Sequence, residues 1–188
     1  IPTAEIPYGL SFESLYQGHL SQLPNGFVLQ SCTLALRDYL LRQGCQVAPM
    51  GAEAILDLPW RGKRSVRELT RRGRRHGTVR EIELNRPHQL KLGQLLKETP
   101  SRRGAQLRHT ERVDFDDSTR CFVFESLENE WLGAITISTV NPTYVHTEML
   151  LRHPDAPVGI MEALVTAISQ QLAQENVRHL SLGNVSPL

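Results

Sequence analysis

One stretch of the chain concentrates arginine. Residues 61–80, RGKRSVRELTRRGRRHGTVR, hold nine of the 21 Lys and Arg residues and a single acid, Glu68. The stretch carries +8 in a chain whose net charge is +1. Segregated positive charge favours a polyanionic partner such as nucleic acid or an anionic lipid surface. The candidate phosphate ligands are Arg64, Arg67, Arg71, Arg72, Arg74 and Arg75. The alternative is a solvated helix partly neutralised by acids that fold over it.

A carboxylate and an imidazole near residue 150 are candidate catalytic groups. Glu148 comes at the end of a predicted strand, where it could accept a substrate ammonium or act as a base on an attacking hydroxyl. To act as a base, a carboxylate needs a pKa that burial has raised. The alternative is a salt bridge from Glu148 to Arg152. His146 lies two residues earlier and so on the same face of a strand, which makes it a rival base or, alternatively, a structural histidine.

The turn that follows is a candidate substrate-binding element. Arg152, His153 and Gly159 precede a predicted helix, whose free N–H groups and dipole favour an anion. Acetyltransferases hold the pyrophosphate of acyl-CoA at such a turn, but Pro154 and Pro157 remove backbone donors, so a nucleic-acid or lipid phosphate fits better than acyl-CoA. The alternative is an ordinary tight strand-to-helix connection.

Several kinds of chemistry lack their motifs. The sequence contains no H-E-x-x-H, G-x-S-x-G, G-x-x-x-x-G-K-[ST] or G-x-G-x-x-G, which disfavours metal, serine hydrolase, NTPase and dinucleotide chemistry. Its three cysteines are far apart, so we expect buried thiols in a reducing compartment and no zinc site. Neither a secretion signal nor a run long enough to cross lipid is found, and we expect a cytoplasmic location, including the inner face of the cell membrane.

Apolar periodicity predicts the elements that position these residues. We expect helices over 11–20, 33–44, 86–98 and 160–175, and strands over 26–31, 52–58, 78–84 and 177–183. Residues 65–68, SVRE, match a capping box, so a helix should start there; after Val66 and Leu69 it has no apolar stripe and should lie on the surface. Residues 119–152 read as three strands joined by short polar turns, an antiparallel meander.

A helix between the last two strands implies a parallel return and a mixed sheet. The fold class is therefore α+β, and the order β-β-β-α-β is typical of N-acetyltransferase-like (GNAT-like) domains. We expect a partial N-terminal lobe with the basic helix at 1–97, a connecting loop at 98–118, and the core unit at 119–188. We also expect the chain to be part of a longer protein, with the fold incomplete at the C-terminus.

Two segments, HTEMLLRHPDAPVGIMEAL and HLSLGNVSPL, resemble the C-terminal catalytic domain of bacterial phosphatidylglycerol lysyltransferases and the uncharacterised proteins grouped with them. In that family an acidic residue and arginines end a strand before PDAP-x-G, an amphipathic helix and a strand reading [SN]LG. The matching positions are Glu148, Arg152, 154–157, Gly159, Met161, Glu162 and 181–183. Residues 51–77 also resemble the family's acidic strand, Gly-Lys turn and basic helix. Leu151 stands where the family has its first arginine.

The resemblance implies transfer of an aminoacyl group from aminoacyl-tRNA to a phospholipid hydroxyl of the phosphatidylglycerol type. Both partners, tRNA and an anionic phospholipid, are polyanions that would suit the basic helix. Any membrane association would come through segments outside this chain. Two alternatives stay open: a non-catalytic module of the same fold that binds RNA or anionic lipid, which Leu151 favours, and an acyl-CoA-dependent acyltransferase.

Overall fold

The computed structural model describes residues 10–29, 32–48, 51–100 and 119–185. Contacts divide the chain into two compact units, one of residues 1–53 with 184–188 and one of residues 54–183. This boundary differs from the expected division at the loop 98–118. The reason is that β2 pairs with a strand beyond that loop and the basic helix packs on a helix beyond it. The segment 101–118 lies outside the described residues.

The first unit is a pair of short helices. Helix α1 spans Phe12–Gly18, the 3-10 turn η1 spans Leu20–Gln22, and α2 spans Leu34–Arg42. Ser11 and Thr33 cap the two α-helices by accepting from Ser14 N and Leu36 N, which confirms both predicted helices. The strand predicted at 26–31 is wrong for residues 26–29, which are irregular. Phe27 and Leu29 pack against the cluster of Leu15, Leu36 and Leu40 between the helices, and propensity alone does not make a strand.

The sheet has the order β1-β6-β5-β4-β3-β2. Its strands are β1 Ala52–Asp57, β2 Gly77–Ile82, β3 Arg120–Ser126, β4 Trp131–Asn141, β5 Tyr144–Arg152 and β6 His179–Val185. Strands β2 to β5 pair antiparallel in succession, and β5 pairs parallel with β6. The predicted meander and the mixed sheet are confirmed.

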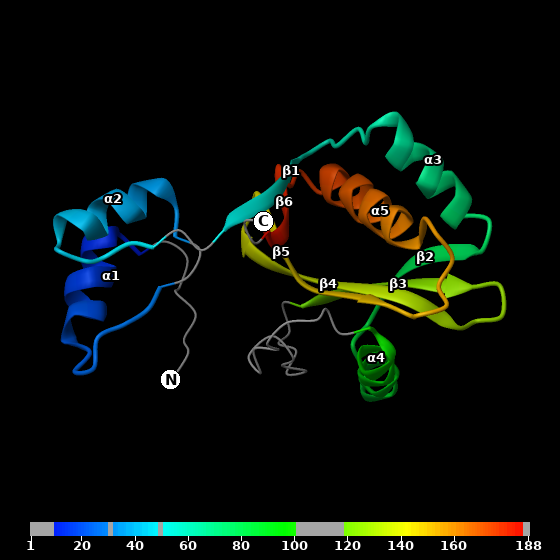
Figure 1. Ribbon diagram of the computed structural model, residues 1–188, viewed down its shortest axis with the longest axis horizontal. Coiled ribbons are helices and arrows are strands. Elements are labelled where there is room, and N and C mark those ends of the chain that lie inside the picture. The colour runs from blue at the N-terminus through cyan, green and yellow to red at the C-terminus, as the bar shows by residue number, and fades with distance from the viewer. Residues whose placement is uncertain (1–9, 30–31, 49–50, 101–118, 186–188) are drawn as a thin grey trace. The chain divides into compact units, whose positions relative to one another are not determined.

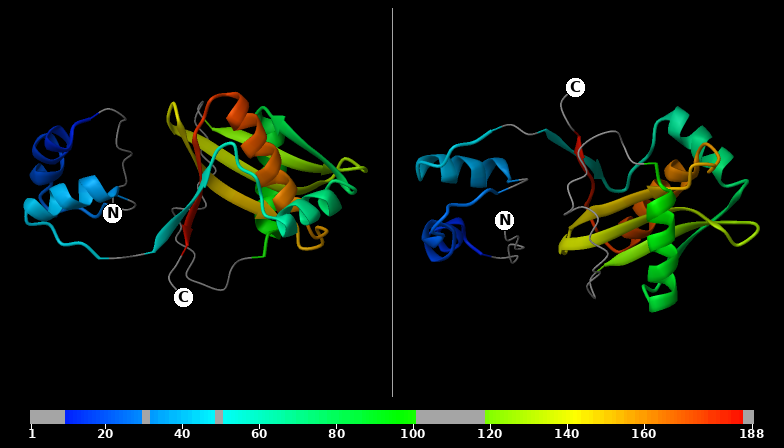
Figure 2. Two further views of the ribbon diagram at one scale, coloured as in Figure 1. Left: turned by 90° about the horizontal axis from the view of Figure 1, so that it is seen from above. Right: turned by 60° about the horizontal axis from the view of Figure 1, so that its bottom comes forward.

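Helices cover both faces of the sheet in the second unit (Figure 1). Helix α5, Ile160–Gln174, lies on one face, and α3, Arg64–Gly73, packs on the outer side of α5. Helix α4, Arg86–Glu98, lies on the opposite face, as the turned views in Figure 2 also show. The unit therefore has four layers: α3, α5, the sheet and α4.

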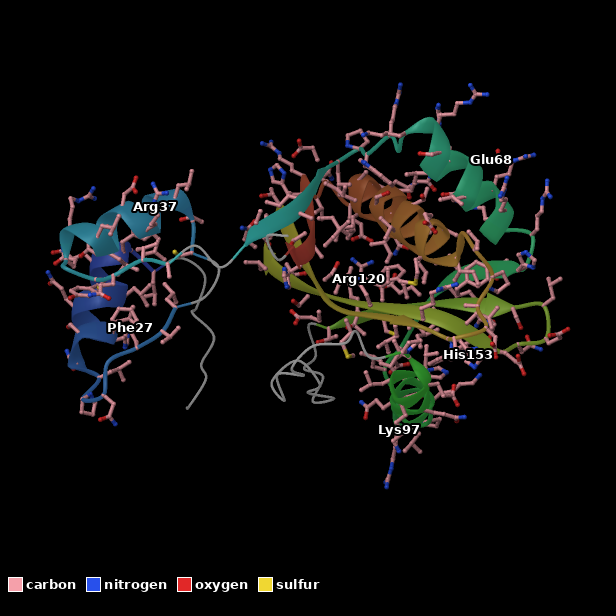
Figure 3. All side chains as sticks on the ribbon, viewed as in Figure 1. Phe27, Arg37, Glu68, Lys97, Arg120 and His153 are labelled. Atoms are coloured by element: carbon pink, nitrogen blue, oxygen red, sulfur yellow. The ribbon has the colours of Figure 1, made fainter. Side chains whose placement is uncertain are left out.

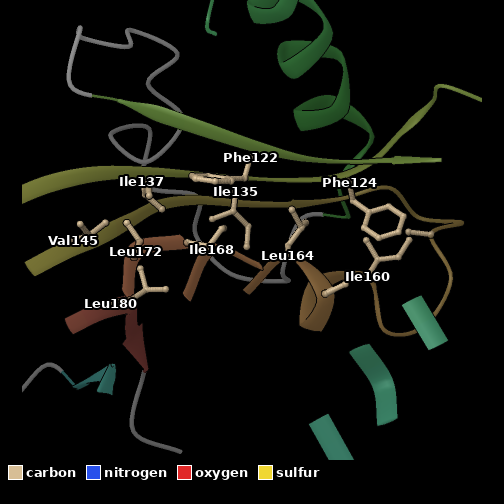
Figure 4. Close-up of a cluster of buried hydrophobic side chains, with 12 residues drawn as sticks. Phe122, Phe124, Ile135, Ile137, Val145, Ile160, Leu164, Ile168, Leu172 and Leu180 are labelled. Carbon is tan, nitrogen blue, oxygen red and sulfur yellow. The ribbon is translucent and has the colours of Figure 1, made fainter. Parts of the chain in front are cut away.

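Two apolar clusters hold these layers together. Under α5, Ile160, Leu164, Ile168 and Leu172 form the predicted stripe at steps of four and are at most 1% exposed (Figure 4). Under α4, Leu92 and Leu95 pack on the other face of β3, β4 and β5. Cys121 belongs to this second cluster, and burial raises the pKa of its thiol to about 12. It is the buried thiol that was expected, whereas Cys32 and Cys45 are only half-buried.

Candidate functional site

The basic helix α3 turns its arginines away from the protein. Its buried residues are Thr70 and Gly73, with Val66 and Leu69 half-buried beside them. At 100° per residue these four positions share one side of the helix. The six predicted arginines lie on the outer side or just past the C-terminus and are all exposed, as the side chains around the labelled Glu68 in Figure 3 illustrate.

Part of this charge is neutralised locally. Glu68 accepts from Arg71 at 2.9 Å and lies 3.5 Å from Arg72. The hydrogen bond from Arg71 lowers the pKa of the Glu68 carboxyl. Within the described residues, no ion pair or side-chain hydrogen bond engages Arg64, Arg67, Arg74 or Arg75. The helix therefore presents four uncompensated guanidinium groups, so neutralisation by acids accounts for only two of the six.

Close backbone packing, and not an apolar stripe, holds α3 on α5. A Cβ atom on Gly73 would lie 2.3 Å from the Gly159 carbonyl oxygen, and one on Gly159 would lie 2.1 Å from the Leu69 carbonyl oxygen. Thr70 Oγ1 also lies 3.3 Å from the Glu162 carbonyl and 3.1 Å from Thr166 Oγ1. The helix lies on the surface without an apolar stripe, as expected, but small residues let it touch α5 directly, which the sequence did not predict.

The capping box was also misassigned. Helix α3 begins at Arg64, its N-cap is Lys63, and no side chain caps it. Ser65 therefore lies inside the first turn. Glu68 does not reach back to the helix start, because its carboxylate pairs with the two arginines that follow it.

Gly159 packs closely against α3. It is the N-cap of α5, with φ of 100°, and it is buried. Leu69 and Gly73 cover this end of α5, which favours the alternative of a tight strand-to-helix connection over a phosphate site at Gly159.

Arg152 and His153 brace the same connection. Arg152 donates to the Ala156 carbonyl at 2.6 Å. His153 accepts from Asp155 N at 3.2 Å, and its Nε2 lies 3.6 Å from Glu98 Oε2. A hollow of about 390 Å³ beside them also includes Arg75 and His76, but three carboxylates line it: Glu128, Glu130 and Asp155. With this balance of charge the hollow does not favour an anion.

Glu148 lies at an irregularity in the centre of the sheet. Thr136 of β4 faces Met149 and the next residue, Ile137, faces Thr147, so Glu148 is the extra residue of a β-bulge. Its carboxylate is exposed and accepts a short hydrogen bond from Ser138. The expected burial is absent, and the alternative of a salt bridge to Arg152 is wrong, because Arg152 is bonded to Ala156.

Strands β5 and β6 diverge just before the bulge. Within the described chain their parallel pairing runs from Tyr144 opposite His179 to His146 opposite Ser181. His146 Nδ1 lies 3.1 Å from Ser181 Oγ, which also accepts from Gly183 N. Beyond this pair the two strands separate, and Glu148 follows on β5. The structure thus brings together His146, Glu148, Ser138 and Ser181.

The alternation of β4 defines which face this group occupies. Ile135 and Ile137 pack under α5, whereas Ala134 packs under α4, so Ser138 belongs to the α4 face. His146 is opposite Ser138 in the register, and Glu148 bonds to it. The candidate catalytic group and the arginines of α3 therefore lie on opposite faces of the sheet and do not line one cleft.

Ser138, Ser181, Thr70 and Gly73 were missed. The serines face Glu148 and His146 only because of strand register, which no local signal in the sequence reveals. A glycine in the middle of an arginine-rich run was the available sign of close helix packing. Among the described residues, no group of three or more His, Cys, Asp or Glu side chains could hold a metal ion, and no helix is long and apolar enough to cross a membrane.

Comparison with known proteins gives relatives of one kind. No family model matches the chain. A lysylphosphatidylglycerol biosynthesis bifunctional protein, LysX of Rhodococcus opacus strain B4, is 27% identical over 158 residues, covering 75% of this chain and 14% of that protein. The resemblance to the phosphatidylglycerol lysyltransferase family is confirmed.

Solved structures of the same kind share the fold. L-PGS from Bacillus licheniformis superposes with a TM-score of 0.58 at 22% identity, covering 74% of this chain and 46% of that one. The C-terminal domain (DUF2156) of a putative lysylphosphatidylglycerol synthetase from Agrobacterium fabrum gives 0.63 at 19% identity, covering 82% and 53%. The fold is α+β and GNAT-like, as expected. The chain spans about half the length of these structures and much less of the curated relative.

Leu151, which stands where the lysyltransferase pattern has an arginine, belongs to the hydrophobic core of this chain. Leu151 is 3% exposed and packs in the cluster under α4 with Met149 and Trp131. A charged side chain at this position would have to be buried there, so Leu151 is a core residue in this chain.

Proposed function

We propose that this chain transfers an aminoacyl group from aminoacyl-tRNA to the hydroxyl of a phosphatidylglycerol-type phospholipid. The names of the curated relative and of both structural neighbours, which concern lysylphosphatidylglycerol or its synthetase, support a phospholipid acceptor. The observation that carries the proposal is the position of Glu148, an exposed carboxylate on a β-bulge where two strands diverge.

In the proposed reaction the lipid hydroxyl attacks the carbonyl of the aminoacyl ester. A new ester bond to the lipid forms, the ester bond to the tRNA ribose breaks, and the ribose oxygen takes up the proton that the hydroxyl loses. An aminoacyl ester is already activated, so holding the two reactants together contributes most, up to ~7–11 kcal/mol of the barrier. The step needs neither a metal ion nor an organic cofactor.

Glu148 would act in this step in one of two ways. Ser138 donates to one carboxylate oxygen, Oε1, and within the described residues the other oxygen accepts no hydrogen bond. The second oxygen can accept the proton of the attacking hydroxyl or bind the ammonium of the aminoacyl group. His146 lies on the same face but is engaged with Ser181, which favours Glu148 over His146 as the group that meets the substrate.

The arginines of α3 would bind the tRNA backbone. Four uncompensated guanidinium groups along a helix suit a chain of phosphates better than one small anion. The arginines of α3 and Glu148 lie on opposite faces of the sheet. A tRNA is longer than this unit is thick, so one tRNA can contact α3 while its acceptor end lies near Glu148. The proposed partners therefore remain aminoacyl-tRNA and anionic phospholipid, at the cytoplasmic face of a membrane.

A second function is favoured by one observation. Leu151 occupies the position of a family arginine and is buried in the core, so that positive group is missing from any active site here. A GNAT-like module that binds RNA or anionic lipid without chemistry would show this substitution.

The test is incubation of the 188-residue chain with charged tRNA and phosphatidylglycerol vesicles. We expect Glu148→Gln to lower the rate of aminoacyl-lipid formation by about 100-fold or more, within the range for a positioned acid–base group, with tRNA affinity unchanged. Glu83→Gln is the matched control, because Glu83 is an exposed acid outside the site. Binding of both partners without turnover in the unmodified chain would instead support the non-catalytic module.

A further inference from the structure

The outer side of α4 carries basic charge that the proposed function has not used. Six of its residues enclose a hollow of about 550 Å³ on this side, namely Arg86, Gln89, Leu90, Gly93, Gln94 and Lys97. At 100° per residue all six fall within one side of the helix, opposite the buried Leu92 and Leu95. The surface is therefore a single stripe, which we name the α4 stripe.

The chemistry of the α4 stripe is cationic and apolar. Arg86 and Lys97 lie about 16 Å apart along the axis by the rise of ~1.5 Å per residue, and no acid lines the hollow between them. Leu90, between the two, is 71% exposed, and Gly93 leaves space because nothing lies within 4 Å of where its Cβ would be. The nearest acid on the helix, Glu98, is bonded to Gln94 and faces His153.

We propose that the α4 stripe docks on the surface of an anionic phospholipid bilayer. Two cations attract lipid phosphates, and an exposed leucine between them can insert among the headgroups. The stripe is on the same face of the sheet as Glu148, so a bilayer there would present its hydroxyls on the side of the candidate catalytic carboxylate. That the α4 stripe binds phospholipid rests on the proposed function, because its two cations would also attract an RNA.

The exposed leucine distinguishes the α4 stripe from the arginines of α3. The outer side of α3 has charge but no large apolar side chain: its apolar residues Val66 and Leu69 are half-buried toward α5. A surface that binds RNA phosphates has no need of an apolar centre, whereas adsorption to a bilayer gains from burying one. The two basic surfaces therefore fit different polyanions.

Vesicle co-sedimentation tests the docking without charged tRNA or turnover. The 188-residue chain is mixed with vesicles of phosphatidylcholine containing 30% phosphatidylglycerol, or with pure phosphatidylcholine. The double variant Arg86→Gln/Lys97→Gln should partition about 25-fold less onto the anionic vesicles, since each basic residue near the surface contributes about fivefold. Leu90→Ser should lower partition about tenfold.

Matched controls separate the α4 stripe from general effects of charge or apolarity. Arg42→Gln/Arg178→Gln removes the same charge from exposed residues outside both basic surfaces, and Leu127→Ser removes an 80% exposed leucine from the β3–β4 turn. Both should bind vesicles like the unmodified chain. The proposal is overturned if the unmodified chain does not prefer anionic vesicles, if the controls lose as much binding as the α4 variants, or if the α4 variants lose tRNA binding instead.

The outcome is independent of catalysis. Aminoacyl transfer combined with vesicle binding that ignores Arg86, Leu90 and Lys97 would refute the docking surface and leave the proposed function standing. Vesicle binding through the α4 stripe without any aminoacyl transfer would support the docking surface and refute the proposed function.

Discussion

Replacement of Gly73 by alanine tests how the basic helix is held in place. The new Cβ would lie 2.3 Å from the carbonyl oxygen of Gly159 and 2.6 Å from its carbonyl carbon. Both are backbone atoms, so no side-chain rotation can relieve the contact. Helices α3 and α5 would have to move apart, and the hydrogen-bond distances from Thr70 to α5 would lengthen with them.

The expected magnitude follows from two opposing effects. Adding a methyl group to a tightly packed contact typically costs 1–3 kcal/mol. Alanine is better than glycine within a helix by up to ~1 kcal/mol, but Gly73 is the last helical residue and gains less. The net loss should be about 1–2 kcal/mol, which corresponds to a fall in Tm of about 2–8 °C for a chain of this size.

Tryptophan fluorescence can follow this unit specifically. The chain has two tryptophans, Trp60 and Trp131, and both belong to the unit of residues 54–183. Gly93→Ala in the middle of α4 is the matched control, because nothing lies within 4 Å of its new Cβ and the substitution should stabilise by up to ~1 kcal/mol. If Gly73→Ala raises the Tm as Gly93→Ala does, the direct contact of α3 with α5 is refuted.

Two further predictions concern charge. Glu68→Gln should release the two arginines paired with it, so tRNA binding should strengthen. The slope of log affinity against log salt concentration should steepen by roughly 0.7–0.9 for each new phosphate contact. An unchanged slope in a salt titration would argue against the helix as the RNA surface. Hydrogen bonds from Arg120 lower the pKa of both Glu81 and Glu175 below the usual 4.5. The two ionised carboxylates therefore stabilise the folded protein above about pH 4.5, and this stabilisation is lost as the pH falls through their lowered pKa values in the folded state. Arg120→Met should therefore flatten the decline of Tm in acid, and equal acid sensitivity of the two proteins would contradict this.

The elements that pack on the sheet could be predicted because each repeats one period. The steps of four in α5 are a property of a single segment, and they bury the apolar stripe as expected. The contact of α3 with α5 could not be predicted in the same way. It depends on Gly73 and Gly159 meeting, and nothing in either segment states which glycine faces which.

The candidate site was only partly predictable for a related reason. Glu148 could be found because an acid in an apolar strand is unusual. Its expected place at the end of the strand was wrong, because Glu148 lies in the middle of β5. That Glu148 is a bulge residue bonded to Ser138 depends on the register of two strands. The hydroxyls of Thr136 and Thr147, beside the bulge, are buried without a hydrogen-bond partner among the described residues.

The layered arrangement makes the two basic surfaces electrostatically independent. Helix α3, helix α5, the sheet and α4 are stacked at roughly 10 Å per layer, so the outer sides of α3 and α4 are about 30 Å apart. The screening length at physiological salt is about 8 Å, and charges several screening lengths apart hardly interact through solvent. Charge changes on α3 should then leave the attraction between α4 and an anionic surface nearly unaltered. A protein that must hold an RNA and a lipid surface at once gains from this separation, because neither polyanion competes with the other for the same arginines.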